Sequence, residues 1–541
     1  MFSSGSAGGP WRRVLIGCLV LAAAVSGCGL PAGAARSADT LVYAVETEPD
    51  CLDPQVSPLD ATAALVRNTH DSLISMDRGG TFHPWLAERW TRSADGLAYT
   101  FRLRPGVRFH DGTRLGASAV RATLDHAVNP KTRSMYAASL LEGYRRTVVV
   151  DELTARVELG RPNAAFLQAL STAYLGIQSP RALAKPAGEL CTRPVGSGPY
   201  ELVSWSRKHS ITLRRNPDYR WGPGPGGRSA PPRIAEITYL FVAEQSVRLG
   251  LLTSGQADAV DNVPPRNVAA LRRSSGYEVQ RTDNPGLPWT LFLNPNRGPL
   301  ADVRVRRALT KAIRLNELVD AVYHGQRTRA FGPLSPTTVH HAAGTPWKDD
   351  PEEAARLLDA AGWKDRDGDG YRVKDGKRLS LFWPYSDFLA RDGRDVMGQG
   401  IQAEARRAGF ELRYTRLDPG QFATRAGSGD ADVLAFSFTR AEPDILRHYF
   451  GSGKTAEKGG SNLFRIADPA LDGWLDRAIT SPDAAVRATA YENAQRYVLD
   501  RALAVPVYVP ATTVGYVSDL RGLRWDPSGY PVFQDALRED S

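Results

Sequence analysis

Apolar and polar residues alternate along this chain in short segments that predict strands interleaved with helices. The run "LVYAVETEP" from residue 41 predicts a strand, and "ADVLAFSF" from residue 431 is nearly continuous in apolar residues, which is typical of a strand covered on both faces. The stretches "EQSVRLGLLTSG" and "PEEAARLLDAAG" have the apolar spacing of helices and end on Gly255 and Gly362. Helices and strands that alternate in this way predict an α/β fold.

Three stretches predict pairs of antiparallel strands. Residues 147–159, "TVVVDELTARVEL", and 201–215, "ELVSWSRKHSITLRR", each contain two alternating segments around a polar turn. Residues 99–113, "YTFRLRPGVRFHDGT", alternate on either side of Pro105-Gly106, so we expect a hairpin that reverses at this pair.

An apolar run near the start, "VLIGCLVLAAAV" from Val14 to Val25, is too short to cross a bilayer permanently but suits an export signal over residues 1–27. The following "VSGC" resembles a bacterial lipobox, so we expect Cys28 to carry a lipid anchor. The alternative is a cysteine that falls near an ordinary cleavage site. Residues 28–39 are small and polar enough for a flexible tether. The protein is therefore expected outside the cytoplasm, attached to the cell membrane.

Charge and cysteine content narrow the class further. The net charge is +9, or +7 without Arg12 and Arg13, and no long block of one sign indicates a nucleic-acid partner. Beyond the signal, only Cys51 and Cys191 remain besides Cys28. Two thiols in an oxidising compartment favour a bridge, which would close a loop of about 140 residues and stabilise the fold by ~4–5 kcal/mol. The alternative is two buried free thiols.

Eight stretches in sequence order together resemble the extracytoplasmic solute-binding proteins of peptide and nickel ABC transporters (family 5, oligopeptide-binding type). The most specific are "YTFRLRPGVRFHDGT" at 99–113 and "LFLNPNRGPLADVRVRRALTKAI" at 291–313. The others are "LDP" at 52–54, "DSL" at 71–73, "HPWLAERW" at 83–90, "PVGSGPYELVSW" at 194–205, "LRRNPDYRWG" at 213–222 and "LTSGQAD" at 252–258. The resemblance covers essentially all of the chain after the signal.

This resemblance implies a fold of periplasmic-binding-protein type II, with two lobes joined by a hinge and an inserted third domain. Lobe I would comprise 40–82, 203–287 and 505–541; the insert would be 83–202 and lobe II 288–504. Cys51 and Cys191 would then lie near the junction of lobe I and the insert, which favours the bridge.

The resemblance also implies a function. The protein would capture a peptide or peptide-like solute and deliver it to an ABC permease, as a monomer and without a cofactor. Two alternatives stay open: a nickel or other metal chelate as the solute, and a surface sensor for a signalling peptide. No nucleophile motif supports an extracytoplasmic hydrolase, so we do not expect an enzyme.

The stretch "AFSFTRAEPDILRHYF" at 435–450 carries the most information about the solute. In oligopeptide-binding relatives a loop here supplies an aspartate for the amine of the peptide, and matching Glu442-Pro443 to the family pattern places Thr439 at that position. Either Glu442 or Asp444 then pairs with the amine, or the solute is not an ordinary peptide. Arg440 is expected either to clamp a carboxylate or to be a solvated loop residue.

Aromatic residues at strand ends are further candidates for the cleft wall. Trp289, Trp383 and Tyr508 could line the gap between the lobes, although packing inside one lobe is the alternative for each. Asn294 could offer its amide to a solute backbone.

Two stretches resemble sites of other classes. In "FGSGKT" at 450–455 the first glycine of a phosphate-binding loop is replaced by His448, and "DRDGDGYRVKDG" at 365–376 ends on Gly376 where a calcium loop has glutamate. The nine histidines show no metal-ligand spacing, so no metal site is predicted. His324 and His448 stay possible contacts for a metal chelate.

Overall fold

The computed structural model describes residues 39–134, 136–224, 229–343, 348–390 and 392–539. The predicted export signal, Cys28 and the predicted tether up to residue 38 lie outside these residues. Within the described ranges, none of the helices combines the length and the apolar character needed to cross a bilayer.

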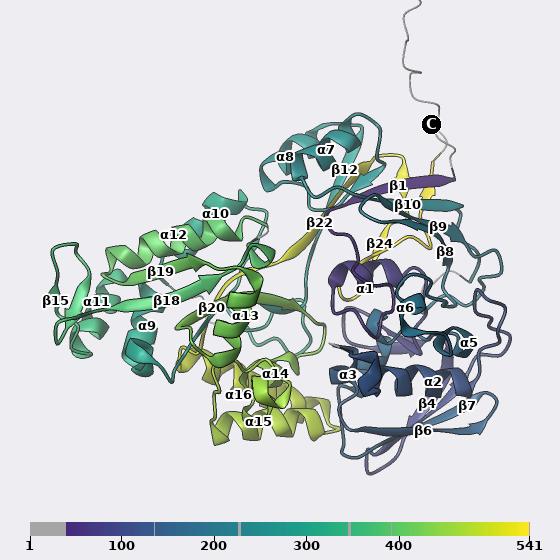
Figure 1. The fold of residues 1–541 in the computed structure, drawn as a ribbon, viewed down its shortest axis with the longest axis horizontal. Coiled ribbons are helices and arrows are strands. Elements are labelled where there is room, and N and C mark those ends of the chain that lie inside the picture. The colour runs from purple at the N-terminus through teal and green to yellow at the C-terminus, as the bar shows by residue number, and fades with distance from the viewer. Residues whose placement is uncertain (1–38, 135, 225–228, 344–347, 391, 540–541) are drawn as a thin grey trace, which may run out of the picture. The chain divides into compact units, whose positions relative to one another are not determined.

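A seven-stranded sheet organises what we call the first lobe (Figure 1). In spatial order its strands are β12 (Tyr277–Asp283), β22 (Ala511–Val517), β11 (Ala259–Val260), β1 (Thr40–Val45), β10 (Glu236–Phe241), β9 (Ser210–Arg215) and β8 (Tyr200–Ser206). β1 runs parallel to both β10 and β11, and the other pairs are antiparallel. The carboxyl ends of β1, β10 and β11 therefore meet at one edge of the sheet. The helices of this lobe are α1 (Asp60–Val66), α7 (Gln245–Thr253) and α8 (Pro265–Arg273).

A second, antiparallel sheet forms what we call the insert. Its order is β4 (Ala87–Arg92), β5 (Ala98–Leu103), β7 (Thr154–Leu159) and β6 (Tyr144–Asp151), and helix α2 (Ala117–Val128) packs on β6 and β7. Every second residue of β5 and β7 is buried, because these residues face one contiguous core shared with the first lobe. The strand pairs predicted over 147–159 and 201–215 are confirmed as β6–β7 and β8–β9.

The hairpin predicted at Pro105-Gly106 is wrong. β5 pairs with β4 on one edge and with β7 on the other, so no edge is left for the segment that follows it. The chain reverses instead at Asp111-Gly112, where Phe109 N donates to Thr113 O and Leu115 N donates to Val107 O, both at 2.9 Å. Gly112 has φ +79°, a backbone conformation that glycine adopts readily. The residue types of Asp111-Gly112 also predict a tight turn, and this prediction is confirmed.

A four-stranded sheet organises the second lobe, in the order β14 (Thr328–Arg329), β21 (Ala504–Val509), β13 (Gly286–Leu293) and β20 (Val433–Thr439). β18 (Ser380–Tyr385) and β19 (Glu411–Arg416) form a separate parallel pair. All residues of β13 and β21 are buried, whereas in β20 only Val433 and Leu434 are. The prediction that the strand from residue 431 is covered throughout is therefore wrong for its second half, which reaches toward the first lobe.

Helices cover the sheets of the second lobe and confirm the α/β class. They are α9 (Val303–Ala312), α10 (Leu315–Tyr323), α11 (Pro351–Ala360), α12 (Arg394–Arg407), α13 (Pro419–Ser428), α14 (Ile445–Phe450), α15 (Pro469–Thr480) and α16 (Ala484–Asp500). The predicted helix ends near Gly255 and Gly362 are present, and both glycines have positive φ.

Two short segments carry the chain between the first and second lobes. One joins β12 to β13 between Asp283 and Gly286, and the other joins β21 to β22 at Pro510. Asn284 N donates to Pro510 O at 2.8 Å, and Thr512 Oγ1 donates to Asn284 Oδ1 at 3.1 Å. The two crossing segments are thus hydrogen-bonded to each other.

A disulfide joins Cys51 to Cys191, whose Cα atoms lie 4.4 Å apart. Beside it, Leu52 N donates to Cys191 O at 2.9 Å. The bridge fastens the segment before α1 to the end of the insert. The domain boundaries expected from the sequence stay a prediction.

Candidate functional site

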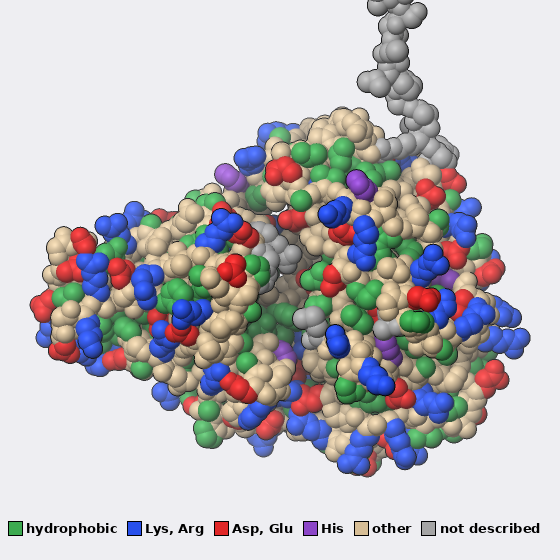
Figure 2. Space-filling model, in the orientation of Figure 1, with side chains coloured by type: hydrophobic (Ala, Val, Ile, Leu, Met, Phe, Trp, Pro, Cys, Tyr) green, Lys and Arg blue, Asp and Glu red, His purple; other side chains and the backbone are tan. Residues whose placement is uncertain are grey.

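A cavity of about 360 Å³ lies between the first and second lobes, and both lobes and the crossing segments line it. Figure 2 shows the surface hollowed at this place. The first lobe contributes Tyr43, Val45, Glu46, Thr47, Asp60, Phe241, Asp261, Asn262, Thr512 and Tyr530, among others. The second lobe contributes Leu389, Asp392, Arg394, Ser437, Phe438 and Thr439, and the crossing segments contribute Asn284 and Pro510. Its size lies within the range of small-molecule sites.

Strand direction explains why polar residues gather here. Glu46 directly follows β1, Asp261 directly follows β11, and Phe241 ends β10. Because these three strands are parallel, the residues after them come together at the same sheet edge, where ligands of open α/β sheets commonly bind.

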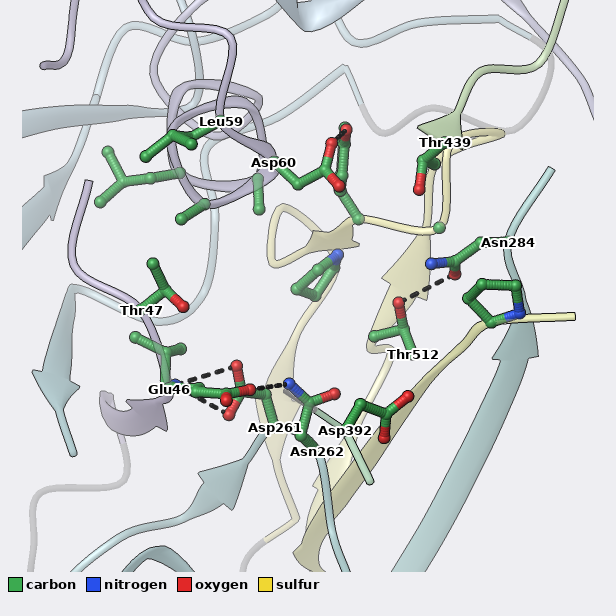
Figure 3. A pocket seen from close by; sticks show the side chains of 18 of the residues that line it. Glu46, Thr47, Leu59, Asp60, Asp261, Asn262, Asn284, Asp392, Thr439 and Thr512 are labelled. Atoms are coloured by element: carbon green, nitrogen blue, oxygen red, sulfur yellow. Dashed lines mark hydrogen bonds between the residues drawn. The ribbon is translucent and has the colours of Figure 1, made fainter. Parts of the chain in front are cut away.

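Glu46, Asp261 and Asn262 form one hydrogen-bonded group in the wall (Figure 3). Glu46 N donates to both carboxylate oxygens of Asp261, at 3.0 and 3.1 Å, and Asn262 Nδ2 donates to Glu46 Oε2 at 2.7 Å. The buried Arg248 lies behind them, with Nε 3.1 Å from Asp261 Oδ1. Burial raises the pKa of Asp261 to about 7, although the charge of Arg248 opposes this. Two carboxyl groups here share one guanidinium.

Asp60 is the first residue of α1 and lies in a different part of the wall from that group (Figure 3). Its Oδ1 accepts hydrogen bonds from Tyr530 OH at 2.8 Å and from Tyr174 OH at 3.1 Å. The residue is exposed, and within the described part of the chain no basic side chain forms an ion pair with it. Asp60 is thus a carboxylate held by neutral donors.

Arg394 stands on the opposite side, at the start of α12. Its side chain is buried, with Nε donating to Tyr508 OH at 3.1 Å and Nη2 donating to Ser437 Oγ at 2.7 Å. The nearby Asp392 is paired with Arg327, whose Nη2 lies 3.0 Å from Asp392 Oδ1. Asp392 thus lies near two guanidinium groups, those of Arg394, which lines the cavity, and of Arg327, which lies behind the wall.

Among the residues expected from the sequence, Thr439 lines the cavity, at the end of β20. Trp289, Trp383 and Tyr508 lie in the core of the second lobe, each at most 2% exposed. Trp289 stacks on Tyr508 with ring centroids 5.5 Å apart, which is the packing alternative for these residues. Tyr508 still contributes to the cavity indirectly, because its hydroxyl holds Arg394.

Asn294 is buried and braces the chain. Its Nδ2 donates to Ala431 O at 2.9 Å and to Gly429 O at 3.2 Å, and its Oδ1 accepts from Asn296 N. The amide is thereby used to fix the segment before β20.

The acidic residues after β20 are already paired within the protein. Glu442 is buried with Oε1 2.8 Å from Arg487 Nη2, and burial raises the pKa of this carboxyl although Arg487 opposes it. Asp444 Oδ2 lies 2.7 Å from Arg447 Nη2. Arg440 is buried, 7% exposed, and its guanidinium lies 5.6 Å from the ring centre of Tyr136 in the insert.

Arg440 belongs to a larger contact between the insert and the second lobe, which we call the closure contact. Glu142 of the insert has Oε2 2.8 Å from Arg447 Nη2 and 2.7 Å from Lys454 Nζ. Ala164 N donates to Ile479 O at 2.7 Å, and the rings of Tyr136 and Phe438 lie 5.4 Å apart. Burial would raise the pKa of Glu142, but its hydrogen bonds and attraction to Arg447 and Lys454 outweigh burial and lower it to about 2.

No cluster of three or more metal-ligating side chains occurs in the parts of the chain that the structure describes. In the turn that resembles a calcium loop, Arg378 contacts both Asp367 and Asp369, so a protein cation already occupies the position between them. His448 is half-buried, and desolvation together with Arg440 lowers its pKa to about 4.

Sequence reasoning missed most of the charged wall, namely Glu46, Asp60, Asp261, Asp392 and Arg394. A signal was present for Glu46, which lies in the run from residue 41 that predicts a strand, whereas the strand before Asp261 is only two residues long and was not predicted. Asp60, Asp392 and Arg394 had no such signal, since helix starts and loops place them only through the tertiary fold.

Known proteins resemble this chain over nearly its whole length. The profile of the bacterial extracellular solute-binding proteins, family 5 (middle region), matches residues 81–457. The chain belongs to this family. The glutathione-binding protein GsiB of Escherichia coli is 27% identical over 518 residues, which are 94% of this chain and 96% of GsiB.

Solved structures of family 5 proteins confirm the type II periplasmic-binding-protein fold. NikA from Brucella suis, in complex with Fe(III)-EDTA, superposes with a TM-score of 0.82 at 22% identity, covering 92% of this chain and all of NikA. The ABC transporter-associated periplasmic binding protein DppA from Helicobacter pylori, in complex with the peptide STSA, gives 0.76 at 23% identity, covering 93% of this chain and 98% of DppA. The relatives are binding proteins rather than enzymes, as expected from the sequence.

Proposed function

We propose that this protein is a lipid-anchored extracytoplasmic receptor that captures a peptide or peptide-like solute and delivers it, unaltered, to an ABC permease. It would act as a monomer, held to the membrane through Cys28. The observation that carries the proposal is the cavity between the lobes, because its wall offers carboxylate, guanidinium, amide and hydroxyl groups from both sides.

Closing around the solute follows from the two crossing segments. These segments are short and paired, so the lobes can rotate about them while each sheet keeps its own hydrogen bonds. A solute favours the closed state only through contacts that the open state lacks. A cavity lined by both lobes meets this condition.

The relatives support a peptide-like solute. GsiB is named for glutathione, and the DppA structure contains a peptide. NikA was solved with Fe(III)-EDTA, a chelate that supplies ligands of its own, so a chelate is the alternative result that the experiment must separate.

Native mass spectrometry of the purified full chain tests the solute class. We expect retained masses that fragment as peptides or peptide-like compounds. Retention of a metal chelate without peptide would replace the peptide by the chelate. If no solute is retained and none from a peptide library binds, the proposal is overturned.

The anchor is tested separately with Cys28→Ala. We expect this variant to move from the membrane fraction to the soluble fraction, because a single diacylglycerol-type anchor would be its attachment. Unchanged membrane attachment would remove Cys28 from the proposal while leaving the solute-binding part intact.

A further inference from the structure

The charges of the cavity wall are divided unequally between the two lobes. In the first lobe, Glu46 and Asp261 share Arg248, and Asp60 adds a carboxylate without a basic partner among the described residues. In the second lobe, Asp392 is matched by Arg327, and Arg394 adds a guanidinium. The first lobe therefore presents surplus negative charge to the cavity, and the second lobe presents surplus positive charge.

The surplus carboxylate is available to a solute. Both tyrosine hydroxyls that donate to Asp60 go to Oδ1, and Oδ2 accepts no hydrogen bond from the described residues. While the cavity holds water this costs little. Once a solute displaces the water, an unpaired carboxylate loses its hydration and needs a cation.

The guanidinium group of Arg394 is already largely desolvated. Arg394 is 8% exposed, its two hydrogen-bond partners are the neutral hydroxyls of Tyr508 and Ser437, and Nη1 bonds to none of the described residues. Asp392 attracts it but is already paired with Arg327, so the two guanidinium groups share one carboxylate. It also begins the 14-residue helix α12, where the helix dipole disfavours a positive charge. A carboxylate would satisfy this group with two charge-assisted hydrogen bonds.

We infer that the solute is a small zwitterion that bridges the lobes, with its amine on Asp60 of the first lobe and its carboxylate on Arg394 of the second. The inference rests on the proposed function and assigns the two groups that select the solute. A solute with only one of the two charges leaves the other pole desolvated on closure, so it closes the lobes less well. Selection for free ends and closure of the lobes thus depend on the same two contacts.

The test uses a library of di- and tripeptides with free ends, together with N-acetylated and C-amidated copies of the same peptides. Retention is measured by ultrafiltration and mass spectrometry on the full chain. We expect the unmodified protein to prefer free ends at least tenfold over either capped form. Asp60→Asn should remove the preference against acetylation, and Arg394→Gln should remove the preference against amidation.

Matched controls keep the test specific. Asp476→Asn changes an exposed aspartate on α15, and Arg407→Gln changes an exposed arginine at the other end of α12; both should keep the full preference. Arg394→Lys retains the charge and should retain part of the preference. Asp60 is exposed, so its variant decides the inference if the Arg394 variants fail to fold.

The outcomes separate the two proposals. Equal binding of free and capped peptides, or an Asp60→Asn variant that behaves like Asp476→Asn, overturns the inference and leaves solute capture standing. Failure of the unmodified protein to retain any peptide overturns the proposed function and the inference with it.

Discussion

The cavity wall and the closure contact both lie where the second lobe meets the rest of the molecule. They differ in whether their charged side chains form ion pairs within the protein. In the closure contact, Glu142 meets Arg447 and Lys454 at hydrogen-bond distance. In the cavity wall, neither Asp60 nor Arg394 forms an ion pair with the described residues, and their hydrogen bonds come from or go to neutral hydroxyls.

The difference teaches which charges serve the fold and which serve the solute. Charged side chains that form ion pairs within the protein stabilise one arrangement of the second lobe and the insert. They offer no unpaired charge to which a ligand could bind. Charges left unmatched around a cavity cost free energy when water leaves, and a ligand of complementary charge recovers it. The residues first expected to bind the solute, Glu442 and Asp444, fall in the matched class.

The largest expected effect comes from releasing the insert that carries one half of the closure contact. The double variant Cys51→Ser/Cys191→Ser should lower the free energy of unfolding by about 4–5 kcal/mol, since the bridge closes a loop of 140 residues. Urea unfolding measures this. Dithiothreitol should reproduce the loss in the unmodified protein, and a loss below about 1 kcal/mol would contradict the expectation.

Breaking the matched charges should favour the open state. Glu142→Gln should destabilise the closed state by about 2 kcal/mol, because it leaves Arg447 and Lys454 without their shared carboxylate. Dyes on Ser118→Cys and Asp476→Cys report the closed fraction by energy transfer. Glu158→Gln is the control, since Glu158 pairs with Arg146 and Arg156 inside the insert; an equal shift in both variants would argue against the closure contact.

The same carboxylate should make closure sensitive to acid. The pKa of Glu142 is lowered from an ordinary 4.5 to about 2, so its contribution to the closed state is fully present above pH 4.5 and is lost as the pH falls toward 2. The difference in closed fraction between the unmodified protein and Glu142→Gln should therefore shrink over this interval. A difference that stays constant down to pH 2 would show that Glu142 does not act through its charge.

The smallest effect concerns Arg440, which the sequence offered as a carboxylate clamp. Arg440→Ala should weaken closure by about 1 kcal/mol, since the guanidinium lies over the Tyr136 ring. Energy transfer and peptide retention together sharpen the assignment. Lost preference for free carboxyl ends, with closure unchanged, would move Arg440 from the closure contact to the solute site.

Local pattern predicted much of the fold. The segments that form the pairs β6–β7 and β8–β9 alternate apolar and polar residues around a polar turn, and the strands pair as this pattern predicts. Gly255 and Gly362 lie just after the ends of two helices, as expected. The reversal after β5 was misplaced because two turn-forming pairs stand six residues apart, and only the pairing of β5 on both edges decides between them.

The candidate site was far less accessible to sequence reasoning. Trp289, Trp383 and Tyr508 were expected at strand ends, where an aromatic residue suits a cleft or a core. The structure places Trp289 and Trp383 inside β13 and β18, and all three residues pack in the core of the second lobe. Thr439 was placed by resemblance to relatives and does line the cavity, whereas Asp60 and Arg394 begin helices that nothing local relates to each other.

By itself, the sequence determined the α/β class, most of the strand pairs formed by neighbouring segments and the family, because each depends on residues close together in the chain or on a recurring pattern. Only the tertiary structure decided which charges meet a partner. Glu142 and Arg447, like Asp60 and Arg394, stand more than 300 positions apart, and they face the same contact or cavity only after the chain has crossed from the first lobe to the second. Electrostatic matching depends on distance in space, and the order of residues does not encode that distance directly.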